Sequence, residues 1–305
     1  GVSLADFNGN GKDDIVLGTD VGNVYLIYDN GEIAPGFPYP TDDKIQSAPS
    51  ILDLGTEKVI FSGSLDNNLY AINSDGSLRF IVEANKKIET SPSFLNYNGK
   101  QYIFFGANDS LIYAIDTNGD ALNGWPVNAG APISKSVVFS DLDCDGQPEV
   151  IASTSQTDVV AYNIDGTSHS GFPINGSSAF TSSAVVVDLD NDGDNEIIFG
   201  DYNGIIHILN EDGTEITGGA FPYDTGDQIW GSIASADLDQ DGFIDFIVPS
   251  KSKHLYIFDI NGLKIDYDAQ LFLVGTPAIG NIDADSDLEI VFSGYSSGNK
   301  LFAIN

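Results

Sequence analysis

A nine-residue pattern of acidic residues recurs along the chain, and an apolar run follows each copy. In its complete form a carboxylate stands at positions one, three, five and nine, and glycine stands at position six. Three complete copies cover residues 141–149, 188–196 and 237–245. Two looser copies cover residues 6–14, where amides replace two carboxylates, and residues 281–289, where Asn281 opens the loop and Ser286 replaces the glycine.

The spacing of these acids predicts binding of Ca²⁺. Calcium takes roughly six to eight oxygen ligands, so a short loop must turn several carboxylates inward at once. Alternate positions do this, and glycine at position six permits a sharp turn without a Cβ penalty. Mg²⁺ fits less well, because it demands strict octahedral geometry and gives up water reluctantly. A solvated Asp/Gly turn explains one isolated copy equally well, but the repetition favours metal binding.

The pattern differs from an EF-hand, whose loop closes with Glu at position twelve and lies between two helices. The runs after position nine are instead rich in β-branched and aromatic residues, which predict strands. Each loop is therefore expected to join two β-strands. The residues at position twelve are Leu17, Ala152, Phe199, Val248 and Phe292.

The repeat extends beyond the acidic loops. Each of seven units contains a further apolar strand, such as residues 205–209, and in six units an Asn-Gly or Asp-Gly turn follows it, which is a strong hairpin signal. Successive units are 43–49 residues apart, a period that indicates a propeller or a solenoid and suits a four-stranded blade. No segment shows helical periodicity, so we expect an all-β chain. The equivalent positions are Asp6, Asp53, Asn96, Asp141, Asp188, Asp237 and Asn281.

The whole chain resembles the FG-GAP or VCBS repeat family, the calcium-loop propeller of integrin α-subunit heads and of many secreted bacterial proteins. The acidic loops before strands carry the resemblance. Elements of the type Gly-Phe-Pro, at residues 36–38, 124–126, 171–173 and 219–222, are closer to the bacterial members and suit an outer edge strand. The resemblance implies a seven-bladed β-propeller with about four antiparallel strands per blade.

We expect one domain, residues 1–305, in seven blades. The sequence stops after the third strand of the last blade. That blade is therefore expected to have three strands, or the chain to be a segment of a longer protein. The absence of Met fits a processed or excised segment, so we expect other domains in the same polypeptide. The expected blades cover residues 1–45, 46–88, 89–132, 133–179, 180–228, 229–273 and 274–305.

In this family, the side chains at positions one, three, five and nine and the backbone carbonyl of position seven bind the ion. The resemblance implies about five Ca²⁺ ions, one in each of blades 1, 4, 5, 6 and 7. Blades 2 and 3 are expected to be metal-free, because their loops are shortened. The implied side-chain ligands are Asp6, Asn8, Asn10, Asp14, Asp141, Asp143, Asp145, Glu149, Asp188, Asp190, Asp192, Glu196, Asp237, Asp239, Asp241, Asp245, Asn281, Asp283, Asp285 and Glu289. The implied carbonyl ligands are Lys12, Gln147, Asp194, Phe243 and Asp287.

The formal net charge of −33 restricts the partners of the chain. With no basic track, nucleic-acid binding is excluded. No apolar run is long enough for membrane insertion. Extracellular modules bind Ca²⁺ with Kd values of roughly 10⁻⁴–10⁻³ M, which match millimolar calcium outside cells. We therefore expect a secreted or cell-surface protein in which calcium is structural.

The sequence shows no catalytic constellation. Its three histidines lie in different units, and no phosphate-binding loop, zinc motif or nucleophile elbow is present. We expect a non-enzymatic adhesion or ligand-binding module for an extracellular protein or glycan. One alternative is a carbohydrate-active or hydrolytic enzyme, or the accessory domain of one. Another is a rigid structural spacer.

Candidate ligand contacts are expected on the propeller face opposite the calcium loops. They are Trp230, Tyr202, Tyr39 and Tyr295, because aromatic rings beside Asn and Asp suit stacking on a sugar or contact with a protein. An exposed Trp is often a binding anchor. Packing of Trp230 as a wedge between neighbouring blades explains that residue equally well.

Overall fold

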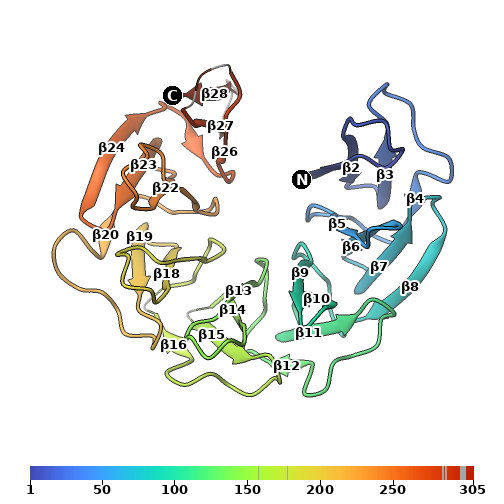
Figure 1. Cartoon of the computed structure of the whole chain (residues 1–305), viewed down its shortest axis with the longest axis horizontal. Coiled ribbons are helices and arrows are strands. Elements are labelled where there is room, and N and C mark those ends of the chain that lie inside the picture. The colour runs from blue at the N-terminus through green and yellow to red at the C-terminus, as the bar shows by residue number, and fades with distance from the viewer. Residues whose placement is uncertain (157, 177, 284, 286, 296–299) are drawn as a thin grey trace. The chain divides into compact units, whose positions relative to one another are not determined.

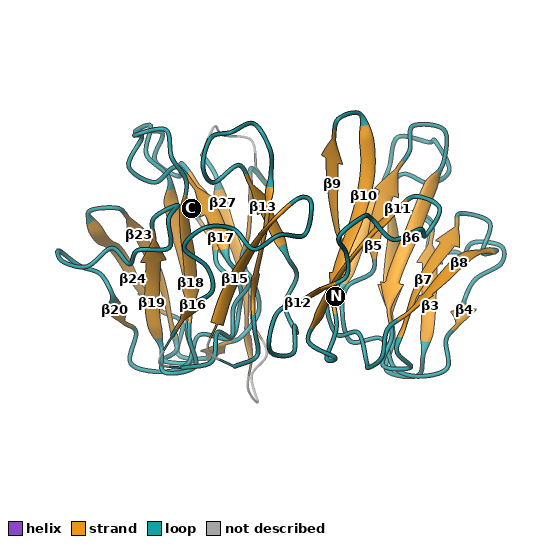
Figure 2. Cartoon of the chain, turned by 90° about the horizontal axis from the view of Figure 1, so that it is seen from below, coloured by secondary structure: helices purple, strands orange, loops and turns teal. Residues whose placement is uncertain are grey.

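The computed structural model describes residues 1–156, 158–176, 178–283, 285, 287–295 and 300–305. All regular structure in these residues is β-strand, which confirms the all-β prediction (Figure 2). The described part of the chain contains no helix with the length and hydropathy of a membrane span. Internal contacts divide the chain into two units, Gly1–Val137 and Val138–Asn305. That the chain forms one domain stays a prediction.

The first unit contains three antiparallel sheets of four strands each, which we number blades 1 to 3 (Figure 1). In each blade the strands are hydrogen-bonded in chain order. Blade 1 consists of β1 (Val2–Ala5), β2 (Asp14–Gly18), β3 (Asn23–Ile27) and β4 (Tyr39–Pro40). Blade 2 consists of β5 (Ser50–Asp53), β6 (Lys58–Gly63), β7 (Asn68–Asn73) and β8 (Leu78–Glu83). Blade 3 consists of β9 (Ser93–Tyr97), β10 (Lys100–Gly106), β11 (Leu111–Asp116) and β12 (Val127–Asn128).

The second unit contains four sheets, blades 4 to 7, and the first three repeat the same strand order. Blade 4 consists of β13 (Val138–Ser140), β14 (Glu149–Ser153), β15 (Asp158–Asn163) and β16 (Ile174–Asn175). Blade 5 consists of β17 (Val185–Val187), β18 (Glu196–Gly200), β19 (Ile205–Leu209) and β20 (Tyr223–Asp224). Blade 6 consists of β21 (Ala234–Ala236), β22 (Asp245–Pro249), β23 (His254–Asp259) and β24 (Gly262–Asp268).

Blade 7 departs from this order. Its strands β26 (Ala278–Gly280), β27 (Glu289–Tyr295) and β28 (Lys300–Ile304) pair in the way of the first three strands of the other blades. The fourth strand, β25 (Phe272–Leu273), precedes them and pairs with the far end of β27. The last blade therefore has the three strands that the sequence predicts, with a two-residue strand added before them.

The apolar cores lie between neighbouring sheets of each unit. In the first unit one cluster joins blades 1 and 2 and another joins blades 2 and 3. In the second unit three clusters join blades 4 and 5, blades 5 and 6, and blades 6 and 7. The second strands β18 and β22 are wholly buried. Both of their faces pack against neighbouring sheets, which explains their continuous apolar runs.

The Gly-Phe-Pro elements lie directly before the short outer strands of blades 1, 3, 4 and 5, and each contains a cis peptide bond before its proline. A Cβ on Gly36 would lie 2.0 Å from the carbonyl oxygen of Asp75, in the Asp-Gly turn of blade 2. Gly171 stands in the same relation to Asp212 of blade 5, at 2.1 Å. Only glycine permits this approach. Two motifs that are separate in the sequence therefore form one contact between adjacent blades.

Candidate metal centres

The acidic loops occupy the same place in five blades. Each joins the first strand of a sheet to the second, as between β13 and β14 or between β17 and β18. This confirms the prediction that the loops join two strands. The acid at position nine is the first residue of the second strand and is buried there, so the strand fixes one end of the loop. These buried acids are Asp14, Glu149, Glu196, Asp245 and Glu289.

One backbone hydrogen bond closes every loop. The N–H at position two donates to a carboxylate oxygen at position nine, as from Leu142 to Oε2 of Glu149 at 2.8 Å. The equivalent bonds of the other loops measure 2.7–3.0 Å. Because this bond uses one oxygen of the buried acid, it orients the other toward the middle of the loop.

A second bond sets the turn. The glycine N–H at position six donates to Oδ2 of the first acid, as from Gly193 to Asp188 at 3.1 Å. Equivalent bonds of 2.7–3.1 Å form at Gly11, Gly146 and Gly242. These three glycines and Gly193 have positive φ, a conformation that other residues seldom adopt. This agrees with the reason for expecting glycine there.

The first, third and ninth acids converge in four blades. In each group the ligand atoms lie within 4.8 Å of one another. These separations allow one small cation to contact all three carboxylates, and oxygen donors suit a hard ion such as calcium. The groups are Asp141, Asp143 and Glu149; Asp188, Asp190 and Glu196; Asp237, Asp239 and Asp245; and Asp283, Asp285 and Glu289.

Unsatisfied oxygen atoms show that these groups fit a cation. Oδ1 of Asp141, Oδ1 of Asp188 and Oε1 of Glu289 are buried and have no hydrogen-bond partner. Oδ1 of Asp245 in blade 6 also makes no hydrogen bond, but Lys264 Nζ lies 2.9 Å from it. A buried oxygen without a partner costs free energy, and a carboxylate oxygen costs more than a neutral one. The loops of blades 4, 5 and 7 therefore each present an acceptor that a bound cation would satisfy.

The pKa values of the buried acids at position nine depend on whether the loop holds a cation. Burial, together with the charges of the neighbouring aspartates, raises the pKa of Glu149 to about 7, although the Leu142 N–H opposes the shift. The same causes raise the pKa of Glu196 to about 7. A cation in the loop would reverse this effect, because it favours the ionised carboxylate.

The loop of blade 7 keeps most of this geometry. Ile282 N–H closes the loop on Glu289, and Asp285 N–H donates to Asp283 at 2.9 Å. The position at which Ser286 replaces the glycine lies outside the described residues, as does residue 284. Asn281 uses its side-chain nitrogen to bond the carbonyl oxygen of Asp285.

The loop of blade 1 satisfies its buried acid from within the protein. Oδ1 of Asp14 accepts bonds from the Asp29 N–H at 2.9 Å and from Nδ2 of Asn8 at 3.4 Å. Nδ2 of Asn10 donates to Asp29, and Lys12 Nζ lies 3.1 Å from Asp29. The two amides thus act partly as donors where the complete loops carry acceptors. The candidate site of blade 1 therefore fits a cation less well than those of blades 4 and 5.

Blades 2 and 3 have short connections at the equivalent place. Residues 54–57 join β5 to β6, and residues 98–99 join β9 to β10. In blade 2, Lys58 Nζ lies 3.1 Å from Asp53, and Arg79 Nη1 lies 2.8 Å from Glu57. Both acids at this junction of blade 2 are thus paired with cationic side chains of the protein.

Sequence reasoning missed the role of position four. Cys144, Asn191 and Gln240 all have positive φ there. The side chain of Asn191 donates to the carbonyl oxygen of Gly242 in the next loop, and Cys144 Sγ lies 3.7 Å from the carbonyl oxygen of Gly193. The acidic loops of consecutive blades are therefore in contact. Gly9 at the same position of blade 1 and Asn191 itself are sequence signals for this conformation, because both residue types adopt positive φ readily.

The predicted ligand contacts fall into two groups. Tyr202, Trp230 and Tyr295 lie at the ends of the blade 5, 6 and 7 strands that are opposite the acidic loops, and their side chains are exposed. Trp230 is 43% exposed, and Lys251 Nζ lies 4.2 Å from its ring centroid. Tyr39 instead begins the outer strand β4 and packs against Tyr70, with ring centroids 5.9 Å apart.

The strand order and the acidic loops define a β-propeller of seven blades whose strand junctions are rich in carboxylates. An FG-GAP-like repeat model matches residues 141–199 and again residues 188–248. These two matches confirm the resemblance to FG-GAP repeat propellers. No curated protein matches the sequence of the chain.

Solved structures show the same fold at low sequence identity. The chain aligns with two crystal structures of BBS1N in complex with ARL6DN, soaked with mercury or with lead. Each alignment has a TM-score of 0.69 and covers 99% of this chain and 90% of the other, at 11% and 10% identity. The computationally designed Ika8 protein aligns with a TM-score of 0.59 and 14% identity, covering 99% of this chain and 95% of the other.

Proposed function

We propose that the chain is an extracellular, calcium-stabilised propeller that binds a protein or glycan and has no catalytic activity of its own. The FG-GAP-like repeats and the propeller fold support a ligand-binding or adhesion module. The buried oxygens of Asp141 and Asp188, which have no hydrogen-bond partner, are the observation that carries the calcium part.

The side chains at positions one, three, five and nine would hold the ion, together with the carbonyl at position seven. Calcium would supply positive charge at the junction of the first and second strands. There it would stabilise the folded state of each blade. At about 1 mM calcium and a Kd near 10⁻⁴ M, each site would add about 1.4 kcal/mol to the free energy of unfolding. Sites of that affinity fill outside cells and stay empty in the cytosol, which is our reason for proposing export.

Calcium counting tests the metal part of this proposal. The calcium-stripped protein would be titrated with Ca²⁺ by calorimetry beside the D141N and D188N variants. The wild type should bind several ions, and each variant should lose one. Each change removes a carboxylate charge from one loop and leaves the other loops intact. Absence of heat and of bound calcium in the wild type at millimolar calcium would refute the proposal.

The ligand part rests on exposed aromatic side chains at the ends of the strands opposite the metal loops. Trp230 and Tyr202 belong to adjacent blades there. A protein partner is the form of ligand that the fold neighbours favour, because BBS1N was crystallised in complex with ARL6DN. Screening the calcium-loaded chain on a glycan array and against purified candidate partner proteins would test this part. A chain that retains no member of either class would contradict it.

A further inference from the structure

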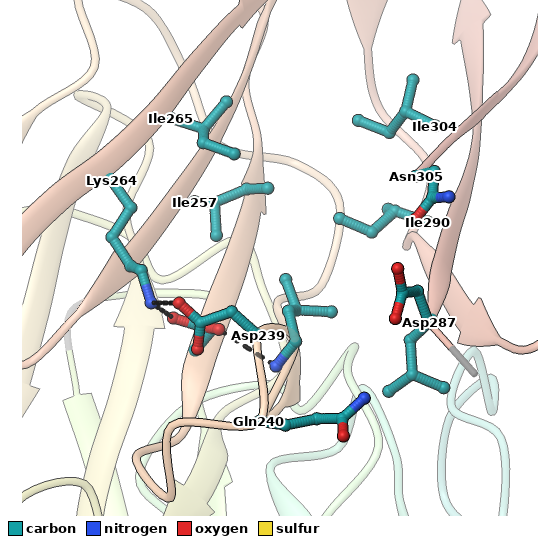
Figure 3. Close-up of a pocket in the computed structure, with 12 residues that line it drawn as sticks. Asp239, Gln240, Ile257, Lys264, Ile265, Asp287, Ile290, Ile304 and Asn305 are labelled. Atoms are coloured by element: carbon teal, nitrogen blue, oxygen red, sulfur yellow. Dashed lines mark hydrogen bonds and ion pairs between the residues drawn. The ribbon is translucent and has the colours of Figure 1, made fainter. Parts of the chain in front are cut away.

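The ammonium group of Lys264 lies inside the acidic loop of blade 6. Its Nζ donates to Oδ2 of Asp239 at 2.7 Å (Figure 3). The same Nζ lies 2.9 Å from Oδ1 of Asp245 and 3.9 Å from Oδ2 of Asp241. The contact with Asp245 is an ion pair, and its angles are not those of a hydrogen bond. Three of the four acids predicted to bind calcium in this loop therefore surround one lysine.

The outer strand β24 positions Lys264. The pairing of β23 with β24 shifts register between Ile257, opposite Ile265, and Phe258, opposite Leu263. Lys264 is the extra residue of this bulge, and a bulge re-aims the side chain that it carries. The side chain runs past Ile257 and Ile265 along one wall of a cavity of about 520 Å³ between blades 6 and 7 (Figure 3).

Blade 2 contains the same arrangement. The pairing of β7 with β8 shifts register between Ala71, opposite Phe80, and Ile72, opposite Leu78. The extra residue is Arg79, which reaches Glu57 at the shortened loop. Blades 2 and 6 are also the ones whose outer strands are long and lack a Gly-Phe-Pro element. A long outer strand with a bulge thus places a cation over the loop in two separate blades.

Blades 4 and 5 differ at the equivalent position. His169 and Ile216 stand there, and their N–H groups bond to Ala161 and Ile208 of the third strands. In these two loops the first acid keeps a buried oxygen without a hydrogen-bond partner. In blade 6, by contrast, Oδ1 of Asp237 accepts from the Asp241 N–H at 3.1 Å. The negative charge of the blade 6 loop is thus compensated by Lys264 of the same blade.

We propose that Lys264 is a tethered cation that occupies the ion position of the blade 6 loop. This loop then keeps its fold without calcium and binds calcium more weakly than the loops of blades 4 and 5. The calcium part of this inference rests on the proposed function, because an arriving ion must displace the ammonium from Asp239 and Asp245. The stabilising part rests on the ion pairs alone.

The strength of the pairing supports this assignment. Lys264 Nζ donates to Asp239 at 2.7 Å and forms an ion pair with Asp245 at 2.9 Å. The carboxylate of Asp245 is 2% exposed. A charge pair with one buried partner is screened less by salt than a pair on the surface.

The K264M variant tests the inference, because Met keeps much of the apolar stem and removes the charge. K100M serves as the matched control, since Lys100 is an exposed residue of blade 3 with the same charge. Calorimetric titration with Ca²⁺ should show one site that binds at least about tenfold more tightly in K264M than in the wild type. The gain should disappear in the K264M/D237N double variant, which assigns it to blade 6. K100M should match the wild type.

Melting in chelator gives a readout that does not depend on calcium. K264M should melt below K100M, because it leaves the buried Asp245 without its cation. Equal melting temperatures of K264M and K100M would overturn the stabilising part. An unchanged isotherm in K264M, with calcium binding intact in the wild type, would overturn the calcium part alone. If the wild type binds no calcium, the proposed function fails, and the melting temperatures still decide whether Lys264 stabilises the loop.

Discussion

Nδ2 of Asn191 donates a 3.0 Å hydrogen bond to the carbonyl oxygen of Gly242, so the acidic loop of blade 5 is held to that of blade 6. Cys144 repeats this relation one blade earlier, where its Sγ lies 3.7 Å from the carbonyl oxygen of Gly193. The glycine carbonyls belong to the positive-φ turns of the acidic loops. Neighbouring acidic loops are therefore in direct contact.

The bond between these loops should affect calcium binding. We predict that N191A loses about 1 kcal/mol of stability in calcium, a typical net value for one hydrogen bond. The calcium affinity of the blade 5 and blade 6 loops should fall a few-fold, because each loses a constraint on its turn. Calorimetric titration and thermal melting measure both effects. N203A, at the opposite end of blade 5, should change neither.

The calcium-stripped protein should lose stability as pH rises from about 4.5 to about 7. The pKa of Glu149 and of Glu196 is raised to about 7 in the folded state, above the unfolded value of 4.5. The folded state thus holds these two protons more tightly than the unfolded chain does. Their stabilising contribution is present below pH 4.5 and is lost as pH rises through 7.

Melting temperatures of the stripped protein at pH 5 and pH 7.5 measure this loss. Burial lowers the pKa of His207, but the hydrogen bond with Glu215 and the charges of Asp201 and Glu215 outweigh it, so this pKa is also raised, with the same sign. The E149Q/E196Q variant isolates the contribution of the glutamates, since it retains His207. Its melting temperature should depend less on pH than that of the wild type. An equal dependence in both proteins would assign the effect to other groups.

Trp230 should matter for ligand retention more than for stability. Its ring is partly exposed, and a cation–π contact with a lysine at an exposed site contributes only about 0.5–1 kcal/mol. W230A should therefore lose binding to the ligand found in the screen and melt within a few degrees of the wild type. Tyr39 gives the contrast, because it packs on Tyr70. Y39A should lose stability and keep ligand binding. A large stability loss in W230A would mean that Trp230 is a packing wedge.

Much of the fold could be predicted from the sequence, because the information is local and repeated. The acids of residues 188–196 and the apolar run after them specify a loop followed by a buried strand. Seven repeats at nearly constant spacing then give the number of sheets. The position of β25 could not be predicted, because Phe272 and Leu273 pair with a strand about 20 residues later and carry no turn signal.

The candidate sites were predicted less completely. The converging acids follow from their spacing, but Lys264 lies 19 residues beyond the loop that it enters. Its direction is set by a bulge between β23 and β24, and no residue pattern marks that bulge. The amides of the blade 1 loop were treated as ligands, whereas Asn8 and Asn10 also donate hydrogen bonds there. Tyr39 is predicted as an exposed ligand contact, whereas its pairing with Val24 places it in strand β4, where it packs on Tyr70.

Thermal unfolding with and without calcium tests the central claim most directly. The wild type and the D141N/D188N variant would be melted in about 1 mM calcium and in chelator. The wild type should melt about 5–10 °C higher in calcium, as expected for several sites of about 1.4 kcal/mol each in a chain of this size. The double variant should lose a large part of that difference. A wild-type melting temperature that is the same in calcium and in chelator would contradict the account.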